Sequence, residues 1–304
     1  MVTIKQSILN QKTPVIHMTN QIVDLSVSLE FGPRILFFGF SGGPNHFFIR
    51  ENDLRNFAKS DEKFHFFGGH RLWAAPEDPV LTYIPDNKPF TWDQKETSVV
   101  LDQILDSPLR KLAKQITIQI HPNSVKVEIT HRLTNLGDQS IKIAPWAITQ
   151  MAPGGIAILP LPPRGSHIGN LLPTSSLVLW PYTDLSDPRW RFGYEYVRVQ
   201  QDLTIPKPLK FGLASNIGWL AYFNHRQMFH KHIKVQENAV YPDRGTSLQV
   251  FLDGDFLELE TMGPLEIMQP GQTLEHQETW QLFANCPPPR NEPQLIEILK
   301  RNNF

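Results

Sequence analysis

A short segment in the first third of the chain gathers side chains of several chemistries. Between Phe66 and Glu77, two adjacent glycines are followed by His70, Arg71 and, two positions later, Trp73. Paired glycines allow backbone angles and close approaches that other residues resist. An indole ring supplies an apolar platform, and a guanidinium supplies paired donors for oxygen atoms. Sugar sites need this mixture, although the same residues also suit a buried loop whose His70 and Arg71 satisfy backbone carbonyls.

Two glutamates near the end of the chain have the spacing of one strand face. The segment 256–264 reads Phe-Leu-Glu-Leu-Glu-Thr-Met-Gly-Pro, and alternation along a strand places Glu258 and Glu260 on the same side. Leu257 and Leu259 are then expected to face the core. If the glutamate face borders a concave site, a carboxylate there can act as a general base. The alternative is that both glutamates are solvated on an outer face.

Three histidines form a third candidate group. His230 and His232 share a predicted strand face, His225 precedes them and Glu237 follows. The His-x-His-x4-Glu spacing resembles the metal motif of cupins, and neutral imidazoles are good zinc or iron ligands. The lysines interspersed with these histidines favour the alternative, a solvated strand face without a metal.

Two polar residues elsewhere are expected to contact a ligand. Lys210 stands before Phe211 and Gly212 and would add a second cation to Arg71. Two cations would favour an anionic sugar, such as a phosphate or a uronate. Asp243 lies in a turn after a strand, where it is either structural or a ligand contact at the rim of a sheet.

Strands are the elements that must position these groups. Apolar and polar residues alternate most clearly in the ranges 23–31, 115–120, 125–130 and 248–252. This pattern is typical of antiparallel strands with one face on a core and one toward water. The 26 prolines exceed the average frequency of about 5% and favour short elements joined by turns. We therefore predict an all-β protein with two packed antiparallel sheets.

Helix signals are few. The segment Glu51–Phe57 is expected to form one or two turns. At the C-terminal end, Asn291 can cap a helix and Pro293 suits its first turn, which predicts a short helix near 292–301. No internal repeat is visible, so we expect residues 1–304 to form one domain.

Composition excludes several classes of protein and site. With 29 basic and 30 acidic residues the net charge is −1, without the basic excess of a dedicated nucleic-acid binder. The one cysteine, Cys286, allows neither an intrachain disulfide nor a zinc site built from cysteines. Residues 1–31 alternate without a continuous apolar run, so neither a signal peptide nor a membrane helix is expected. We predict a cytoplasmic protein with no nucleic-acid or membrane partner and no cofactor.

The order of four segments resembles the galactose mutarotase-like superfamily, and within it the aldose 1-epimerase-like proteins. The resemblance spans nearly the whole chain and is carried by the segments 30–35, Glu-Phe-Gly-Pro-Arg-Ile; 68–73, Gly-Gly-His-Arg-Leu-Trp; 218–222, Gly-Trp-Leu-Ala-Tyr; and 259–280, with its Glu-Thr, Pro-Gly and Glu-Thr-Trp groups. It implies a large antiparallel β-supersandwich and a small-molecule sugar or sugar phosphate as the ligand.

The resemblance also implies a mechanism. In mutarotases a glutamate takes the proton of the anomeric hydroxyl while a histidine protonates the ring oxygen, so that the ring opens and can close on either face. Glu260 matches the family glutamate best, with Glu258 as the second choice. The family histidine belongs on a middle strand, which here reads Ala144–Met151 and contains none. His70 is therefore expected to substitute as the acid.

Substrate contacts complete the expected site. Arg71, Trp73, Lys210, Asp243 and Glu258 are expected to touch the substrate, as are Trp146 and Gln150 on the middle strand. Three functions stay open at this point. They are an aldose epimerase that uses Glu260 and His70, a sugar-binding protein without catalysis, and a cupin-like metal enzyme that uses His230 and His232.

Overall fold

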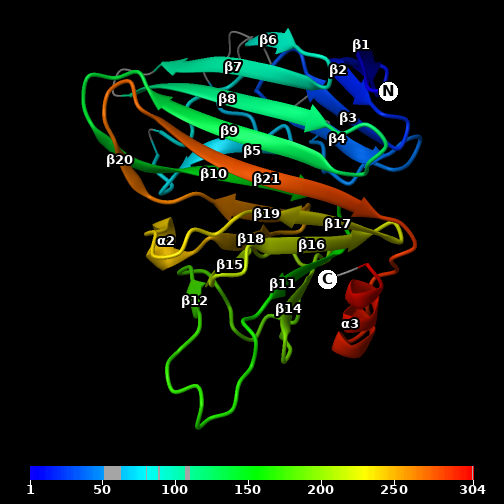
Figure 1. Cartoon of the computed structure of the whole chain (residues 1–304), viewed down its shortest axis with the longest axis vertical. Helices are drawn as coiled ribbons and strands as arrows, with labels where there is room; N and C mark the ends of the chain where they lie inside the picture. The colour runs from blue at the N-terminus through cyan, green and yellow to red at the C-terminus, as the bar shows by residue number, and fades with distance from the viewer. Residues whose placement is uncertain (51–62, 80, 88–89, 107–109, 303) are drawn as a thin grey trace.

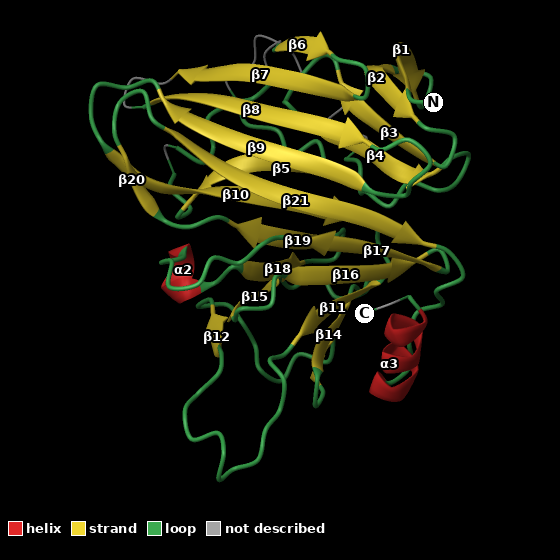
Figure 2. Cartoon of the chain, viewed as in Figure 1, coloured by secondary structure: helices red, strands yellow, loops and turns green. Residues whose placement is uncertain are grey.

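Two large antiparallel sheets stack on one another along most of the chain (Figures 1 and 2). The computed structural model describes residues 1–50, 63–79, 81–87, 90–106, 110–302 and 304. The predicted helical turns at Glu51–Phe57 lie outside these residues. The predicted all-β fold with two packed sheets is confirmed.

The first sheet carries most of the residues that the sequence analysis singled out. Among the described residues it has eleven strands in the order β1-β2-β3-β4-β5-β10-β19-β18-β15-β12, with β20 paired to β10. Their bounds are β1 Thr3–Leu9, β2 Thr13–Thr19, β3 Val23–Ser28, β4 Ile35–Phe40, β5 His70–Ala75, β10 Ile141–Met151, β12 Ser176–Leu179, β15 Leu209–Ala214, β18 Leu248–Leu252, β19 Leu257–Met262 and β20 Glu266–Met268.

The second sheet covers one face of the first. Within the described ranges it has ten strands in the order β13-β14-β11-β16-β17-β21-β9-β8-β7-β6. Their bounds are β6 Thr91–Gln94, β7 Ser98–Asp106, β8 Lys111–Ile120, β9 Val127–Asn135, β11 Ile156–Pro160, β13 Trp190–Phe192, β14 Tyr196–Gln200, β16 Trp219–Asn224, β17 Gln227–His232 and β21 Thr273–Phe283.

Alternation along the strands builds the core between the sheets. In β8, Leu112, Ile116 and Ile118 are buried together with Lys114, and the alternate residues Ala113, Gln115 and Thr117 are only partly buried. Leu257 and Leu259 of β19 also point into this core, as the sequence predicts, and both are fully buried. Since both leucines face the second sheet, Glu258 and Glu260 lie on the other face of the first sheet.

Helices are short and peripheral (Figure 2). The helix α3, Glu292–Arg301, begins where the capping pattern places it: the Asn291 side chain accepts a hydrogen bond from the backbone N–H of Gln294. The label α2 marks a single turn, Pro242–Gly245, in which Asp243 and Arg244 have left-handed backbone angles. Of the helices in the described part of the chain, none combines the length and apolarity that crossing a bilayer requires.

Candidate functional site

Three neighbouring strands of the first sheet bring distant parts of the sequence into one row. Ile148 of β10 lies opposite Arg71 of β5 on one side and opposite Glu260 of β19 on the other. In antiparallel neighbours, residues that lie directly opposite point to the same face. Trp146 pairs in the same way with Trp73. One face of the sheet therefore presents an arginine, two tryptophans and a glutamate, although about 190 residues separate the first and last of them in sequence.

A cavity of about 240 Å³ opens on this face. The residues that line it come from β5, β10, β15, β18 and β19 and from the loops around them. They are Arg50, Phe66, Arg71, Trp73, Glu77, Tyr83, Trp146, Tyr182, Lys210, Phe251, Asp253, Phe256 and Glu258. Aromatic rings and charged groups thus surround one small hollow, which is the composition of a small-molecule site.

Arg71 and Glu258 form an ion pair at the floor of the cavity. The Nη2 atom of Arg71 donates to Oε1 of Glu258 at 3.1 Å, and Nε2 of Gln150 donates to the same oxygen at 2.8 Å. The guanidinium also stacks on Trp73, with its Cζ 4.1 Å from the ring centroid. Burial lowers the pKa of Arg71, and the charge of Glu258 opposes that shift. Glu258 and Trp73 thus hold the arginine, which also borders the cavity.

Glu260 lies just behind the wall of the cavity. It is fully buried, and its Oε2 accepts hydrogen bonds from Nε1 of Trp146 at 2.8 Å and from Nζ of Lys210 at 3.0 Å. Burial raises the pKa of Glu260 to about 7; Lys210 opposes this rise and Glu258 adds to it. A carboxyl group with a pKa near neutrality can exchange protons at physiological pH. Trp146 and Lys210 themselves line the cavity, so that they separate it from Glu260.

Lys210 is held between two indole rings. Its Nζ lies 4.7 Å from the ring centroid of Trp146 and 4.9 Å from that of Trp180. The ammonium group thus makes cation–π contacts with both rings besides its hydrogen bond to Glu260. The two cations of the cavity floor, Arg71 and Lys210, are therefore each matched by a glutamate.

His70 does not reach the cavity, contrary to the expectation that it faces Glu260 as the acid. Adjacent residues of a strand point to opposite faces, so His70 points away from the side on which Arg71 lies. Its ring is fully buried between the sheets, where Nδ1 contacts Oγ1 of Thr149 at 2.8 Å and Nε2 contacts Nε2 of His131 at 2.8 Å. Among the described residues, no histidine lines the cavity.

A buried polar network surrounds His70 between the two sheets. Lys231 of β17 forms an ion pair with Glu278 of β21 at 2.8 Å and donates to Oγ1 of Thr149 at 3.0 Å. Burial alone would raise the pKa of Glu278, but the ammonium group of Lys231 holds it below its usual range. Burial lowers the pKa of His131 to about 4 and that of His70 well below its usual range. Both imidazoles are therefore neutral at pH 7.

The same network brings three potential metal ligands together. Donor atoms of His70, His131 and Glu278 all lie within 4.8 Å of one another. Each of these atoms already has a hydrogen-bonding partner: the two histidines bond to each other, and Oε2 of Glu278 accepts from Nε1 of Trp280. A divalent cation there would also lie beside the buried ammonium of Lys231, which a low-dielectric interior disfavours. The cluster therefore fits a metal-free polar network.

The cupin-like histidines do not form a metal site in the described part of the chain. His230 is buried and His232 exposed, with ring centroids 6.4 Å apart, and the groups that could hold an ion there include neither. His225 lies in the turn between β16 and β17, beside His46, at a ring-centroid distance of 5.9 Å. The metal site that the His-x-His spacing left open as an alternative is therefore not formed by these histidines among the described residues.

Asp243 also lies outside the group of residues that line the cavity. Its Oδ2 accepts a hydrogen bond from Nε2 of Gln249 at 2.8 Å, which ties the α2 turn to β18. Gln249 lies opposite Glu260 on β19, whereas the residues of these two strands that line the cavity are the opposed pair Phe251 and Glu258. Asp243 therefore makes a structural contact between the turn and β18, rather than the expected contact with a ligand.

Several lining residues were not found from the sequence. Tyr83 and Tyr182 lie in loops, and Phe251 lies on β18 opposite both Lys210 and Glu258. Burial raises the pKa of both tyrosines above the usual value of the phenol, so their hydroxyl groups stay protonated at neutral pH. The alternation of β18 could have placed Phe251 on one face, but only the order of strands in the sheet shows that this face borders the cavity.

Solved structures share this architecture over most of the chain. A protein from Synechocystis sp. PCC 6803 aligns with a TM-score of 0.58 and 13% identity over 91% of this chain and 99% of its own. A galactose mutarotase-like protein from Lactobacillus casei ATCC 334 aligns with a TM-score of 0.57 and 10% identity over 88% and 99% of the two chains. A galactose mutarotase related enzyme from Lactobacillus acidophilus aligns with a TM-score of 0.51 and 9% identity over 91% and 100%. No family model and no curated protein matches the sequence. The likeness at these identities shows a shared fold.

Proposed function

We propose that this chain, whose fold is galactose mutarotase-like, binds an uncharged monosaccharide in the cavity above Arg71 and Glu258. The observation that supports the proposal most strongly is an unpaired hydrogen-bond donor on Arg71. This side chain is almost fully buried and borders the cavity, yet its Nη1 atom has no hydrogen-bond partner among the described residues. A buried donor without a partner costs free energy, and a hydroxyl group placed in the cavity would recover it.

The aromatic residues support a sugar over other polar ligands. Trp73 meets Trp146 edge to face, with ring centroids 5.3 Å apart, and meets Tyr83 at 5.5 Å. These rings give the cavity an apolar wall next to the polar floor of Arg71 and Glu258. A sugar ring has the same two-sided character, with C–H groups on its faces and hydroxyls around its rim.

Charge pairing favours an uncharged sugar over a phosphorylated or acidic one. The sequence analysis counted Arg71 and Lys210 as two cations available for an anion, but Glu258 and Glu260 neutralise them at 3.1 and 3.0 Å. An anionic group in the cavity would approach these carboxylates as well as the cations. Binding of a hexose should therefore be at least as tight as binding of the corresponding hexose phosphate.

Aldose 1-epimerase activity is a second candidate function, which the pKa of Glu260 favours. Ring opening needs a base for the anomeric hydroxyl and a donor for the ring oxygen. Glu258 lines the cavity and Glu260, with a pKa of about 7, lies directly behind it. Two nearby carboxyl groups in different environments can divide the roles of base and acid. His70 has no part in this scheme.

Sugar titrations of the wild type and of an Arg71→Gln variant test the proposal. Binding would be followed by calorimetry across a panel of hexoses and hexose phosphates, with Arg290→Gln as a control because Arg290 is exposed just before α3, outside the residues that line the cavity. Loss of a hydrogen bond from a charged donor should weaken binding about tenfold or more in Arg71→Gln only. If the wild type binds no sugar, or if both variants bind equally well, the proposal is wrong.

The epimerase candidate needs a separate measurement. Exchange between the two anomers of each bound sugar would be followed by NMR with the wild-type protein. Exchange faster than in buffer, reduced by Glu258→Gln, is the expected result if the chain is an epimerase. Measurable sugar binding without accelerated anomer exchange would support sugar binding as the function and would contradict the epimerase hypothesis.

A further inference from the structure

Exposed apolar side chains concentrate on one end of the molecule. Among the described residues, eighteen large apolar side chains are exposed, and ten of them lie between residues 168 and 203. Contiguous exposed apolar surface on a soluble protein commonly marks an interaction site. The ten are Ile168, Leu171, Leu172, Leu177, Leu179, Tyr182, Leu185, Phe192, Tyr194 and Leu203.

Part of this surface is a projecting arm formed by residues 161–175, which extends away from both sheets at the bottom of Figure 1. Near its tip, Ile168, Leu171 and Leu172 are 90%, 76% and 82% exposed. Burying one such side chain contributes about 1.5–3 kcal/mol. The arm therefore carries apolar groups that the chain's own core leaves uncovered.

The arm leads directly into a free edge of the first sheet. The strand β12 is the last strand there and pairs only with β15 among the described strands. Its sequence is Ser-Leu-Val-Leu, without the charged or proline residues that usually protect an edge. Leu177 and Leu179 lie opposite Leu213 and Phe211, which belong to the core between the sheets, yet they are 40% and 42% exposed. The core is thus open at this edge.

The second sheet ends at the same place. Its last strand on this side is β13, and the ring of Trp190 on β13 lies 5.3 Å from that of Phe211 on β15. Phe192, two residues further along β13, is 49% exposed. Both sheets therefore present unpaired backbone groups and apolar side chains at one end of the sandwich.

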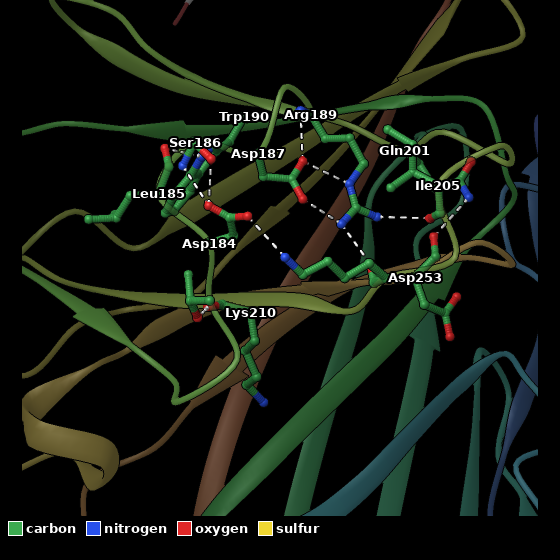
Figure 3. Close-up of polar contacts among 12 residues, drawn as sticks. Asp184, Leu185, Ser186, Asp187, Arg189, Trp190, Gln201, Ile205, Lys210 and Asp253 are labelled. Carbon is green, nitrogen blue, oxygen red and sulfur yellow. Dashed lines mark hydrogen bonds and ion pairs between the residues drawn. The ribbon is translucent and has the colours of Figure 1, made fainter.

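The loop between these two edges is held in a fixed shape (Figure 3). Asp187 accepts hydrogen bonds from Nε and Nη2 of Arg189, and Nη1 of Arg189 donates to the carbonyl of Ile205. Leu185, in the same loop, is 64% exposed and extends away from this group of contacts in Figure 3. A surface that is already ordered loses little conformational entropy when a partner binds.

The charged residues of the loop are paired within the chain. Asp187 pairs with Arg189 at 2.8 Å, and Asp184 pairs with Lys207 at 2.9 Å. A surface that meets an identical copy of itself places like charges near one another, which costs free energy when those charges are unpaired. Internal pairing removes that cost here, so the loop suits self-association.

We propose that this apolar end, formed by the arm 161–175, β12, the loop 184–189 and β13, is the dimer interface between two copies of this chain. The edge of β12 pairs antiparallel with the same strand of the second copy across a twofold axis, and the two arms cover the open cores. A second copy satisfies the free backbone groups of a strand edge, which a lipid surface does not. Tyr182, a cavity residue, lies in sequence between β12 and the loop 184–189, so the dimer brings the interface to the rim of the sugar site.

Sedimentation and light scattering of the full chain at micromolar concentrations test this proposal. The wild type should have twice the monomer mass. The double variant Leu171→Asp/Leu172→Asp and the variant Leu177→Lys should dimerise at least about tenfold more weakly. Ile8→Asp is the matched control, because Ile8 is 56% exposed on β1, at the opposite edge of the same sheet, and it should dimerise like the wild type.

Circular dichroism of each variant shows whether it is folded, so that loss of mass is not mistaken for unfolding. In the wild type, amide hydrogen exchange in residues 176–179 should slow as protein concentration rises. A wild type that stays monomeric at all these concentrations would overturn the proposal. So would a dimer that persists unchanged in both the arm variant and Leu177→Lys.

Discussion

At the residue scale, the site depends on which side chains share a face of one sheet. Glu258 and Glu260 share a face, as their spacing predicts, while Leu257 and Leu259 fill the core. Side chains alternate between the two faces along a strand. Applied to the Gly-Gly segment, this alternation would have placed the side chains of His70 and Arg71 on opposite faces. No strand is predicted for this segment from the sequence, whereas His70 is the first residue of β5.

The first prediction at this scale concerns the protonation of Glu260. Its pKa is raised from 4.5 to about 7 in the folded protein. A raised pKa means that the folded state favours the protonated carboxyl, so the contribution of Glu260 to the free energy of unfolding is greatest below pH 4.5. That contribution is lost as the pH rises toward 7, by at most about 3 kcal/mol. Glu260→Gln should not show this decline.

Urea unfolding of the wild type and Glu260→Gln at pH 4.5, 6 and 7.5 measures this difference. Glu266→Gln serves as the control, since Glu266 is an exposed glutamate on β20. The difference in unfolding free energy between the wild type and Glu260→Gln should change with pH in the stated direction, and that for Glu266→Gln should stay constant. A constant difference for both variants would contradict the assignment.

At the element scale, the order of strands determines which distant residues meet. The sequence predicts the strands well, because alternation with period two follows directly from half-buried faces. It does not predict that β10 lies between β5 and β19, which is what joins Arg71, Trp146 and Glu260. Pairing order depends on contacts between strands that are remote in sequence, so Tyr182 and Phe251 could not be assigned to the cavity.

Behind the cavity floor, Lys231 connects the two sheets. Besides its ion pair with Glu278, its Nζ donates to the backbone carbonyls of Ala147 on β10 and Leu259 on β19. These strands carry the floor of the cavity on their other face. The lysine therefore joins the second sheet to the strands that position Glu258 and Glu260.

Removing Lys231 should destabilise the protein strongly. In Lys231→Met the carboxylate of Glu278 loses its partner while it stays fully buried, and breaking such a pair typically costs about 3–5 kcal/mol. The double variant Lys231→Met/Glu278→Gln should recover part of this loss because no charge is then left unpaired. Denaturant unfolding measures both values. A single variant within about 1 kcal/mol of the wild type would show that the ion pair contributes little.

At the scale of the whole molecule, the cavity and the exposed apolar surface lie in different parts of the sandwich. The outer face of the first sheet carries the cavity, and the end at β12 and β13 carries the apolar surface. Charge composition agrees with both proposals, because a net charge of −1 neither attracts polyanions nor repels a second copy. The sequence predicts the general fold and, through the family resemblance, several residues that line the cavity, but it does not predict the apolar end.

The central claim, that a sugar binds against Trp73 in this cavity, is tested most directly by observing the tryptophan side chains during a sugar titration. NMR signals of the indole N–H groups would be followed in the wild type, in Trp73→Ala and in Trp92→Ala, whose tryptophan lies on β6 of the other sheet. We expect the signals of Trp73 and Trp146 to shift in the wild type and that of Trp92 to stay unchanged. Affinity should fall about tenfold or more in Trp73→Ala and stay constant in Trp92→Ala. Sugar binding that shifts neither cavity tryptophan, or that survives Trp73→Ala unchanged, would contradict the account.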